Sequence, residues 1–131
     1  MIDFIRLGFG VSMPYGDCEQ YDFIADVDGK LLKIQCKTAH LEKDGESIDV
    51  DFRMVRKNAQ GKKIVVLYTP ADIDYFATWY KGQTYLIPVT VGGFRKRLRF
   101  SPSPAQHHKA SYAEDYELEK VIEEIRRGTN E

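Results

Sequence analysis

The sequence contains little cysteine and no long apolar run. Its 131 residues include two cysteines, Cys18 and Cys36, which are too few for a disulfide framework or a cysteine-based zinc site. No apolar stretch approaches the ~20 residues that span a membrane, and the opening residues lack the basic start of a signal peptide. These absences argue against a disulfide-stapled secreted domain. They predict a cytoplasmic protein without a membrane partner.

An excess of charge of one sign is also absent. The chain has 19 basic and 20 acidic residues and a net charge of −1, so its bulk charge gives no support for nucleic-acid binding. Basic residues nevertheless gather in two segments, which hold Arg53, Arg56, Lys57, Lys62 and Lys63, and then Arg95, Lys96, Arg97 and Arg99. Clusters of this kind either contact phosphates or form a solvated surface.

The residues that are present suit one folded domain. With 131 residues, of which 43% are hydrophobic and 12% aromatic, the chain is long enough to bury a core. We therefore expect a single domain over residues 1–131.

A β-hairpin is the clearest local signal. Asp28-Gly29 is typical of a two-residue turn in which both residues take positive φ. Pairing outward from this turn places Phe23 opposite Ile34, and residues two apart on a strand share a face. One face is then apolar, with Phe23, Ala25, Val27, Leu32, Ile34 and Cys36. We expect that face, Cys36 included, to be buried in the core.

The opposite face of the hairpin carries groups suited to chemistry on phosphate. The register makes Asp22 and Gln35 cross-strand neighbours, with Cβ atoms roughly 5 Å apart, and Lys37 follows one pleat later. Carboxylate and amide oxygens are hard ligands that suit Mg²⁺. A nearby lysine can stabilise charge developing on a phosphate. The alternative is a hairpin whose second face is simply solvated.

The rest of the chain predicts a mixture of strands and helices. A short helix is expected near residues 2–7 and a longer one over residues 114–127. Strands are expected over residues 47–53, 64–68, 73–79 and 83–89, with a turn at Lys81-Gly82 and a loop over residues 54–63. Pro88 favours an edge strand. This order indicates an α/β fold with a mixed central sheet.

The spacing Asp22…Gln35-x-Lys37 resembles the bipartite signature of PD-(D/E)XK nucleases, with Tyr21 where proline is usual and Gln35 in place of an acid. Both departures occur in a branch that includes intron-encoded homing endonucleases. Four flanking runs also look like that branch: Val11-Ser12-Met13-Pro14-Tyr15-Gly16-Asp17, Ile73-Asp74-Tyr75-Phe76-Ala77, Thr84-Tyr85-Leu86-Ile87-Pro88-Val89 and Tyr112-Ala113-Glu114-Asp115-Tyr116. The resemblance covers most of residues 8–118.

The resemblance implies a restriction-endonuclease-like core and a DNA endonuclease that depends on Mg²⁺, with Mn²⁺ as a substitute. It implies that Asp22, Gln35 and the carbonyl of Cys36 hold the metal and that Lys37 polarises the water or the phosphate. Double-stranded or branched DNA is the implied partner, with phosphate contacts from Lys33, Arg53, Arg56, Lys57, Arg95 and Arg97. Cutting both strands of a duplex leads us to expect a homodimer or homotetramer.

The N-terminal helix departs from the family pattern. Members usually supply a further acid from this helix, but here it is shortened or begins upstream of Met1, and Asp3 is its one acid. Asp17 could act as a second ligand, although such an aspartate more often caps a turn. The pair His107-His108 lacks a spaced metal partner. Three alternatives stay open: a Holliday-junction resolvase-like nuclease, a DNA-binding protein that no longer cuts, and a structural protein.

Overall fold

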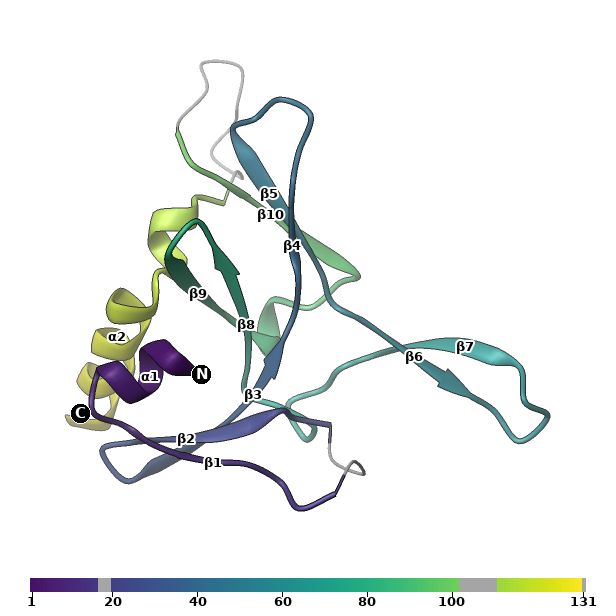
Figure 1. Cartoon of the computed structure of the whole chain (residues 1–131), viewed down its shortest axis with the longest axis horizontal. Helices are drawn as coiled ribbons and strands as arrows, with labels where there is room; N and C mark the ends of the chain where they lie inside the picture. Colours follow the sequence, from purple (N-terminus) through teal and green to yellow (C-terminus); the bar gives the residue numbers. More distant parts are fainter. Residues whose placement is uncertain (17–19, 102–110, 131) are drawn as a thin grey trace.

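A five-stranded mixed sheet forms the centre of the molecule (Figure 1). The computed structural model describes residues 1–16, 20–101 and 111–130. The strand order is β1-β2-β3-β8-β9, formed by β1 (Gly10–Ser12), β2 (Phe23–Val27), β3 (Lys30–Cys36), β8 (Tyr75–Tyr80) and β9 (Gln83–Pro88). Strands β3 and β8 are parallel and their neighbours are antiparallel. The predicted α/β class with a mixed sheet is confirmed.

The β2–β3 hairpin has the register that the sequence predicts. Phe23 lies opposite Ile34 and Val27 lies opposite Lys30. The two turn residues, Asp28 and Gly29, have φ values of 54° and 89°. Only this left-handed backbone closes the turn without splaying the strands, which is why Asp-Gly occupies it. The second predicted turn is confirmed in the same way, because Lys81 and Gly82 have φ values of 46° and 83°.

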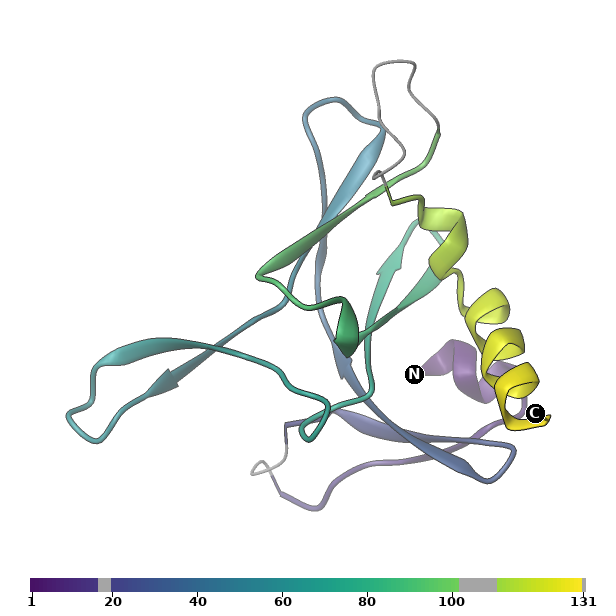
Figure 2. The ribbon, with the colours of Figure 1, turned by 180° about the vertical axis from the view of Figure 1, so that it is seen from behind.

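Two helices cover one face of this sheet (Figures 1 and 2). The N-terminal helix α1 (Ile2–Arg6) is short, as expected, and buries Phe4. A 3₁₀ turn, η2 (Ala113–Tyr116), precedes the C-terminal helix α2 (Leu118–Asn130), so the predicted helix begins later and continues past Gly128. The core between helices and sheet includes Phe4, Phe23, Ala25, Leu32, Ile34, Leu86, Leu118 and Ile122. No helix of the described residues has the length and apolarity needed to cross a membrane.

A three-stranded antiparallel sheet packs on the other face of β8 and β9. It has the order β10-β5-β4, formed by β4 (Ala39–Leu41), β5 (Ser47–Asp51) and β10 (Arg95–Arg99), the last reached through η1 (Val89–Val91). This second core includes Ile48, Val50, Phe52, Ile73, Phe76, Ile87 and Leu98. Phe52 stacks on Phe76 with ring centroids 4.2 Å apart. This contact ties the end of β5 to the centre of the main sheet.

Residues 53–67 form a separate hairpin, which we call the arm. It consists of β6 (Arg53–Lys57) and β7 (Lys63–Leu67), which pair with each other and with none of the other strands that the structure describes. The arm projects away from both sheets (Figures 1 and 2). The predicted loop over residues 54–63 is therefore wrong. The sequence pattern did not predict these strands because both faces of the arm mix apolar and basic residues. The alternation typical of a half-buried strand is therefore missing.

The predicted burial of Cys36 is also wrong, because its side chain is exposed. Cys36 does share a strand face with Ile34, which is fully buried. However, it is the last residue of β3. Alternation along a strand predicts which face of the sheet a side chain lies on, but not how far the layer packed on that face extends. Here that layer ends before Cys36.

Candidate active site

Asp22 is held against the end of strand β3. Its backbone N–H donates to the carbonyl oxygen of Ile34 at 2.8 Å, which extends the hairpin by one residue beyond β2. Its side-chain Oδ2 accepts a hydrogen bond from the backbone N–H of Cys36 at 2.7 Å. The carboxylate is therefore fixed by the backbone of the opposite strand. The carboxylate also interacts with the Cys36 side chain, and this interaction contributes to raising the pKa of the Cys36 thiol.

Gln35 lies between Asp22 and the neighbouring strand β8. The register of β2 and β3 ends at Phe23 and Ile34, and Gln35 is the parallel partner of Phe76 on β8. The backbone N–H of Asp22 bonds to Ile34 rather than to Gln35, so the placement of Asp22 opposite Gln35 stays a prediction. Its side chain is half-buried on the face of the sheet that carries the second core. No hydrogen bond to its amide is found among the described residues. The amide oxygen is thus free to join the Asp22 carboxylate as a second oxygen donor.

Lys37 points from the end of β3 toward the root of the arm. Its backbone N–H donates to the carbonyl oxygen of Ala77 at 2.8 Å, and its Nζ donates to the carbonyl oxygen of Arg53 at 3.0 Å. The ammonium also lies 4.8 Å from the ring centre of Tyr68. Burial lowers the pKa of Lys37, and the nearby carboxylates of Asp51 and Asp22 oppose this shift only in part. An ammonium held in this way has two N–H groups left for a phosphate.

Two further residues, Asp51 and Tyr68, lie beside Lys37. Neither was predicted from the sequence as part of the site. Asp51 ends β5, and hydrogen bonds from the Arg53 side chain and backbone lower its pKa to about 2. Tyr68 follows β7, and its burial, followed by the charge of Asp22, raises the pKa of its phenol. In the predicted alternating strand over residues 47–53, Asp51 falls on the face opposite to Ile48 and Val50, and this position is a signal that could have identified it. Nothing local in the sequence singles out Tyr68.

The six predicted DNA-contacting residues separate into two groups. Arg53, Arg56 and Lys57 all lie on β6, where they are exposed beside the site. Arg53 is paired with Asp51, with its Nη2 atom 2.5 Å from Oδ2. These three residues share one projecting element, which the sequence did not predict. Their contacts with DNA stay predictions.

The other three predicted residues have partners within the protein. The Nζ of Lys33 donates to the carbonyl oxygen of Ala71 at 2.8 Å. Arg95 and Arg97 of β10 form ion pairs across their sheet, at 3.5 Å with Asp49 and at 3.4 Å with Glu42. These pairs locally neutralise the second basic cluster. Contacts between Lys33, Arg95 or Arg97 and DNA stay predictions, and the ion pairs weaken the case for them.

The donor atoms suit a hard divalent cation, although acidic ligands are few. Within residues 1–16, 20–101 and 111–130, no group of three His, Cys, Asp or Glu side chains could hold a metal. The carboxylate of Asp3 accepts a hydrogen bond from the Thr84 hydroxyl and forms an ion pair with Arg6. Asp17 and His107-His108 lie outside the described residues. The Asp22 carboxylate and Gln35 amide are nevertheless the oxygen donors that Mg²⁺ and Mn²⁺ accept, so the residues fit such an ion.

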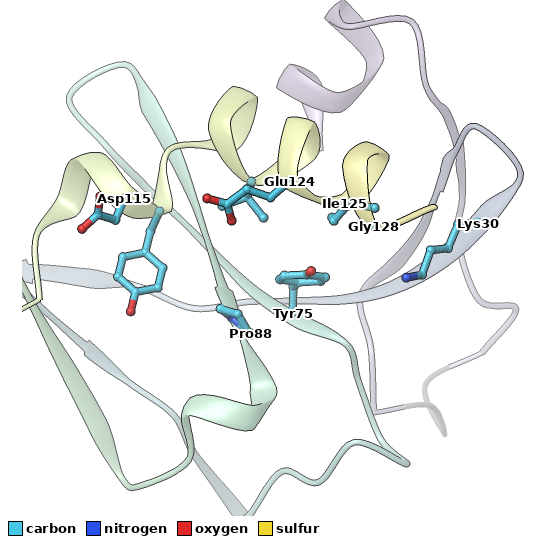
Figure 3. Close-up of a pocket in the computed structure, with 9 residues that line it drawn as sticks. Lys30, Tyr75, Pro88, Asp115, Glu124, Ile125 and Gly128 are labelled. Atoms are coloured by element: carbon cyan, nitrogen blue, oxygen red, sulfur yellow. The ribbon is translucent and has the colours of Figure 1, made fainter. Parts of the chain in front are cut away.

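Hollows of about 650, 420 and 280 Å³ lie beside the main sheet, and the last two bear on the site. One, of about 420 Å³, lies beside α2 and is lined by residues such as Tyr75, Pro88 and Glu124 (Figure 3). Tyr75 pairs with the core residue Ile34, so this hollow is on the helix-bearing face, away from Gln35. A second hollow, of about 280 Å³, is lined in part by Cys36 and Lys37. It leaves open space beside the proposed site.

Comparison with known proteins agrees with this geometry. A family model described as PD-(D/E)XK endonuclease matches residues 1–119. The solved structure of a bacterial homing endonuclease, I-Ssp6803I, is similar with a TM-score of 0.73 and 27% sequence identity, over 99% of this chain and 88% of that one. No curated protein matches significantly. The family match spans both halves of the Asp22…Gln35-x-Lys37 signature, and the chain therefore belongs to the PD-(D/E)XK endonuclease family.

Proposed function

We propose that this protein is a divalent-metal-dependent endonuclease that hydrolyses phosphodiester bonds in DNA, with Asp22, Gln35 and Lys37 as its site. Membership of the endonuclease family and the similarity to a homing endonuclease support a nuclease. The observation that carries the site assignment is the hydrogen bond to the Asp22 carboxylate from the N–H of Cys36, the residue directly before Lys37. It holds an acid at the end of β3, beside the backbone that joins Gln35 to Lys37.

Each residue has a role that follows from its position. Asp22 and Gln35 supply oxygen donors for the cation, with the carbonyl of Cys36 as the proposed third. When bound, a divalent cation supplies Lewis-acid chemistry toward a phosphate oxygen and lowers the pKa of water. Lys37 places two N–H groups beside the same position and stabilises negative charge that develops on the phosphate. Since burial lowers its pKa, Lys37 also exchanges a proton more readily near neutral pH than an ordinary lysine.

The carboxylate of Asp51 is a supporting group in this proposal. It lies close enough to Lys37 for its charge to act on the ammonium, yet its hydrogen bonds go to Arg53. We assign it a positioning role, in which it orients Arg53 and keeps Lys37 protonated. Cutting both strands of a duplex requires two such sites, so we propose a homodimer or a higher symmetric assembly.

Cleavage of supercoiled plasmid and of a four-way junction, with Mg²⁺ or Mn²⁺, tests the proposal. We expect metal-dependent cutting by the parent chain and none by Asp22→Ala or Lys37→Ala. The preferred substrate separates a homing-type enzyme from a junction resolvase. Lys43→Ala, in an exposed turn, is the matched control and should cut like the parent. Cutting that is equal in all four proteins would exclude this site.

A DNA-binding protein that no longer cuts is the second candidate. Gln35 stands where the family usually has an acid, and Asp3 is engaged by Thr84 on β9. Asp22 is thus the one carboxylate that the proposed donor set contains. Equal DNA binding by the parent, Asp22→Ala and Lys37→Ala, with no cleavage by any of them, would favour this candidate.

A further inference from the structure

The arm concentrates positive charge, although the chain as a whole has no net positive charge. Residues 53–67 contain five basic residues and no acidic residue, while the whole chain has a net charge of −1. In the structure these residues lie on one projecting hairpin and its loop (Figure 1). The loop is ordered by Asn58, whose Oδ1 accepts hydrogen bonds from the N–H groups of Gln60 and Lys62 at 3.0 and 2.9 Å. The arm is therefore a shaped cationic element.

One face of the arm exposes groups whose arrangement costs free energy in the isolated protein. Val55 lies opposite Val65, and Lys57 lies opposite Lys63 on the same face. The valines are 63% and 53% exposed. Like charges directly opposed across two strands repel and destabilise the pair. This face thus presents two solvated apolar side chains and an uncompensated lysine pair.

The protein itself supplies little to offset these costs. The arm pairs with no other described strand, and a lone two-stranded hairpin is marginally stable in water. No ion pair involves Lys57 or Lys63 among the described residues. A polyanion with apolar surface between its charged rows would satisfy both features. Duplex DNA has this character, because phosphates flank a groove that exposes base edges and thymine methyl groups.

We propose that the arm enters the major groove of duplex DNA, with Lys57 and Lys63 on the phosphates and the Val55–Val65 face against base edges. This inference rests on the proposed function and names the form of its substrate. The major groove is about 12 Å wide and admits a two-stranded β-ribbon, whereas proteins that bind the minor groove, about 6 Å wide, commonly kink or bend the duplex to do so. The arm is such a ribbon.

The root of the arm links this contact to the proposed chemistry. Lys37 donates a hydrogen bond to the carbonyl of Arg53, the first residue of β6. The five residues of β6 extend about 17 Å from that point. At about 3.4 Å of duplex per base pair, the tip reaches about five base pairs from the cut. The arm therefore contacts sequence that flanks the cut rather than the cut itself.

The first test removes the paired lysines. The variant Lys57→Ala with Lys63→Ala is compared with Lys30→Ala with Lys43→Ala, an equal charge change at the start of β3 and in the turn before β5. The probes are a labelled duplex of random sequence and a four-way junction, titrated over a range of salt concentrations. We expect the slope of log affinity against log salt to fall by about two for the arm variant on the duplex. The control should keep the parent slope.

The outcomes separate the arm from the nuclease proposal. A parent that binds DNA, with an unchanged slope in the arm variant, would overturn the arm proposal alone. Absence of DNA binding by the parent would overturn the proposed function, and the arm proposal with it. Loss of fold does not confuse the result, because removing opposed lysines should leave the melting temperature equal or higher.

The second test identifies the groove and the partner. A methyl group on guanine N7 lies in the major groove, and one on adenine N3 lies in the minor groove. We expect N7 methylation to weaken binding of the parent and to have less effect on Val55→Ala with Val65→Ala. Interference from adenine N3 alone would overturn the assignment. The alternative occupant of this face is a second copy of the chain, and sedimentation of the same variant tests it. Loss of self-association with unchanged DNA binding would assign the face to a second copy and overturn the proposal.

Discussion

The ammonium nitrogen of Lys37 lies 3.0 Å from the backbone carbonyl oxygen of Arg53, so the end of β3 is joined to the first residue of β6. The acceptor is backbone, and the bond therefore does not depend on the Arg53 side chain. Tyr68, just after the other strand of the arm, packs below the same ammonium. The lysine is thus held by both ends of the arm.

Replacing Asp22 by asparagine should lower the pKa of Cys36. The side chain is exposed, but the protein atoms around it desolvate the thiol in part and raise its pKa, and the charge of Asp22 raises it further. Removing that charge lowers the pKa, so more thiolate is present at a given alkaline pH. Asparagine can still accept the hydrogen bond from the Cys36 N–H, and the fold should be retained.

Alkylation rates of Cys36 measured against pH, in a Cys18→Ala background, check this prediction. The profile should move to lower pH for Asp22→Asn. Asp26→Asn removes the same charge from the strand that follows Asp22 and should leave the profile nearly unmoved. If both substitutions shift it equally, the Asp22 carboxylate is not placed against Cys36 as described.

Gln35→Glu should tighten binding of Mn²⁺. The change adds a second carboxylate to the proposed donor set, and hard cations bind charged oxygen ligands more strongly than neutral ones. We expect a gain of at least about tenfold, equivalent to about 1.4 kcal/mol, by titration calorimetry. Gln60→Glu in the arm loop is the control of equal charge. Equal affinity of the parent and Gln35→Glu would remove Gln35 from the metal site.

Acid stability should depend on the Asp51–Arg53 pair. Hydrogen bonds from Arg53 lower the pKa of Asp51 from 3.8 to about 2. A carboxylate with a lowered folded-state pKa stabilises the fold above its unfolded value of 3.8, and this contribution is lost as the pH falls toward 2. The effect should be small because both side chains are largely solvated.

Urea denaturation between about pH 2 and pH 5 measures this dependence. Asp51→Asn should flatten the loss of stability over that range. The same substitution in an Arg53→Ala background should change little, because its partner is already gone. An undiminished effect in that background would mean that Arg53 is not the cause of the shift.

Phe52→Ala should destabilise the fold by about 3–5 kcal/mol, since it empties a fully packed position. Phe52 is 1% exposed and stacks on Phe76, the parallel neighbour of Gln35. Because Asp51 and Arg53 flank Phe52, cleavage should fall as well. Val55→Ala, an equally apolar position three residues later on the exposed arm, should change the free energy of unfolding by less than about 0.5 kcal/mol. Similar costs for both variants would contradict the packing described here.

Local signals predicted the hairpin that carries the site. Asp28-Gly29 set the turn, and the apolar face set the register as far as Phe23 and Ile34. The placement of Asp22 opposite Gln35 stays a prediction. The grouping of Lys37, Asp51 and Tyr68 could not be predicted in this way. It requires β5 to end where Phe52 packs on Phe76 and the arm to return to its starting point, and these contacts join residues distant in sequence. The prediction that Cys36 is buried was wrong for a related reason. Its exposure depends on where the layer that covers the sheet ends, and that is set by contacts between distant residues.

The two ends of the arm adjoin, because Arg53 is the register partner of Leu67. Residues could therefore be added or removed as cross-strand pairs farther out while the root keeps its place beside Lys37. No residue of the arm belongs to either core cluster among the described residues, so such changes would leave the packed interior alone. The length of the arm can thus vary independently of the cutting chemistry. That length would set the distance between the broken bond and the flanking sequence that the arm contacts.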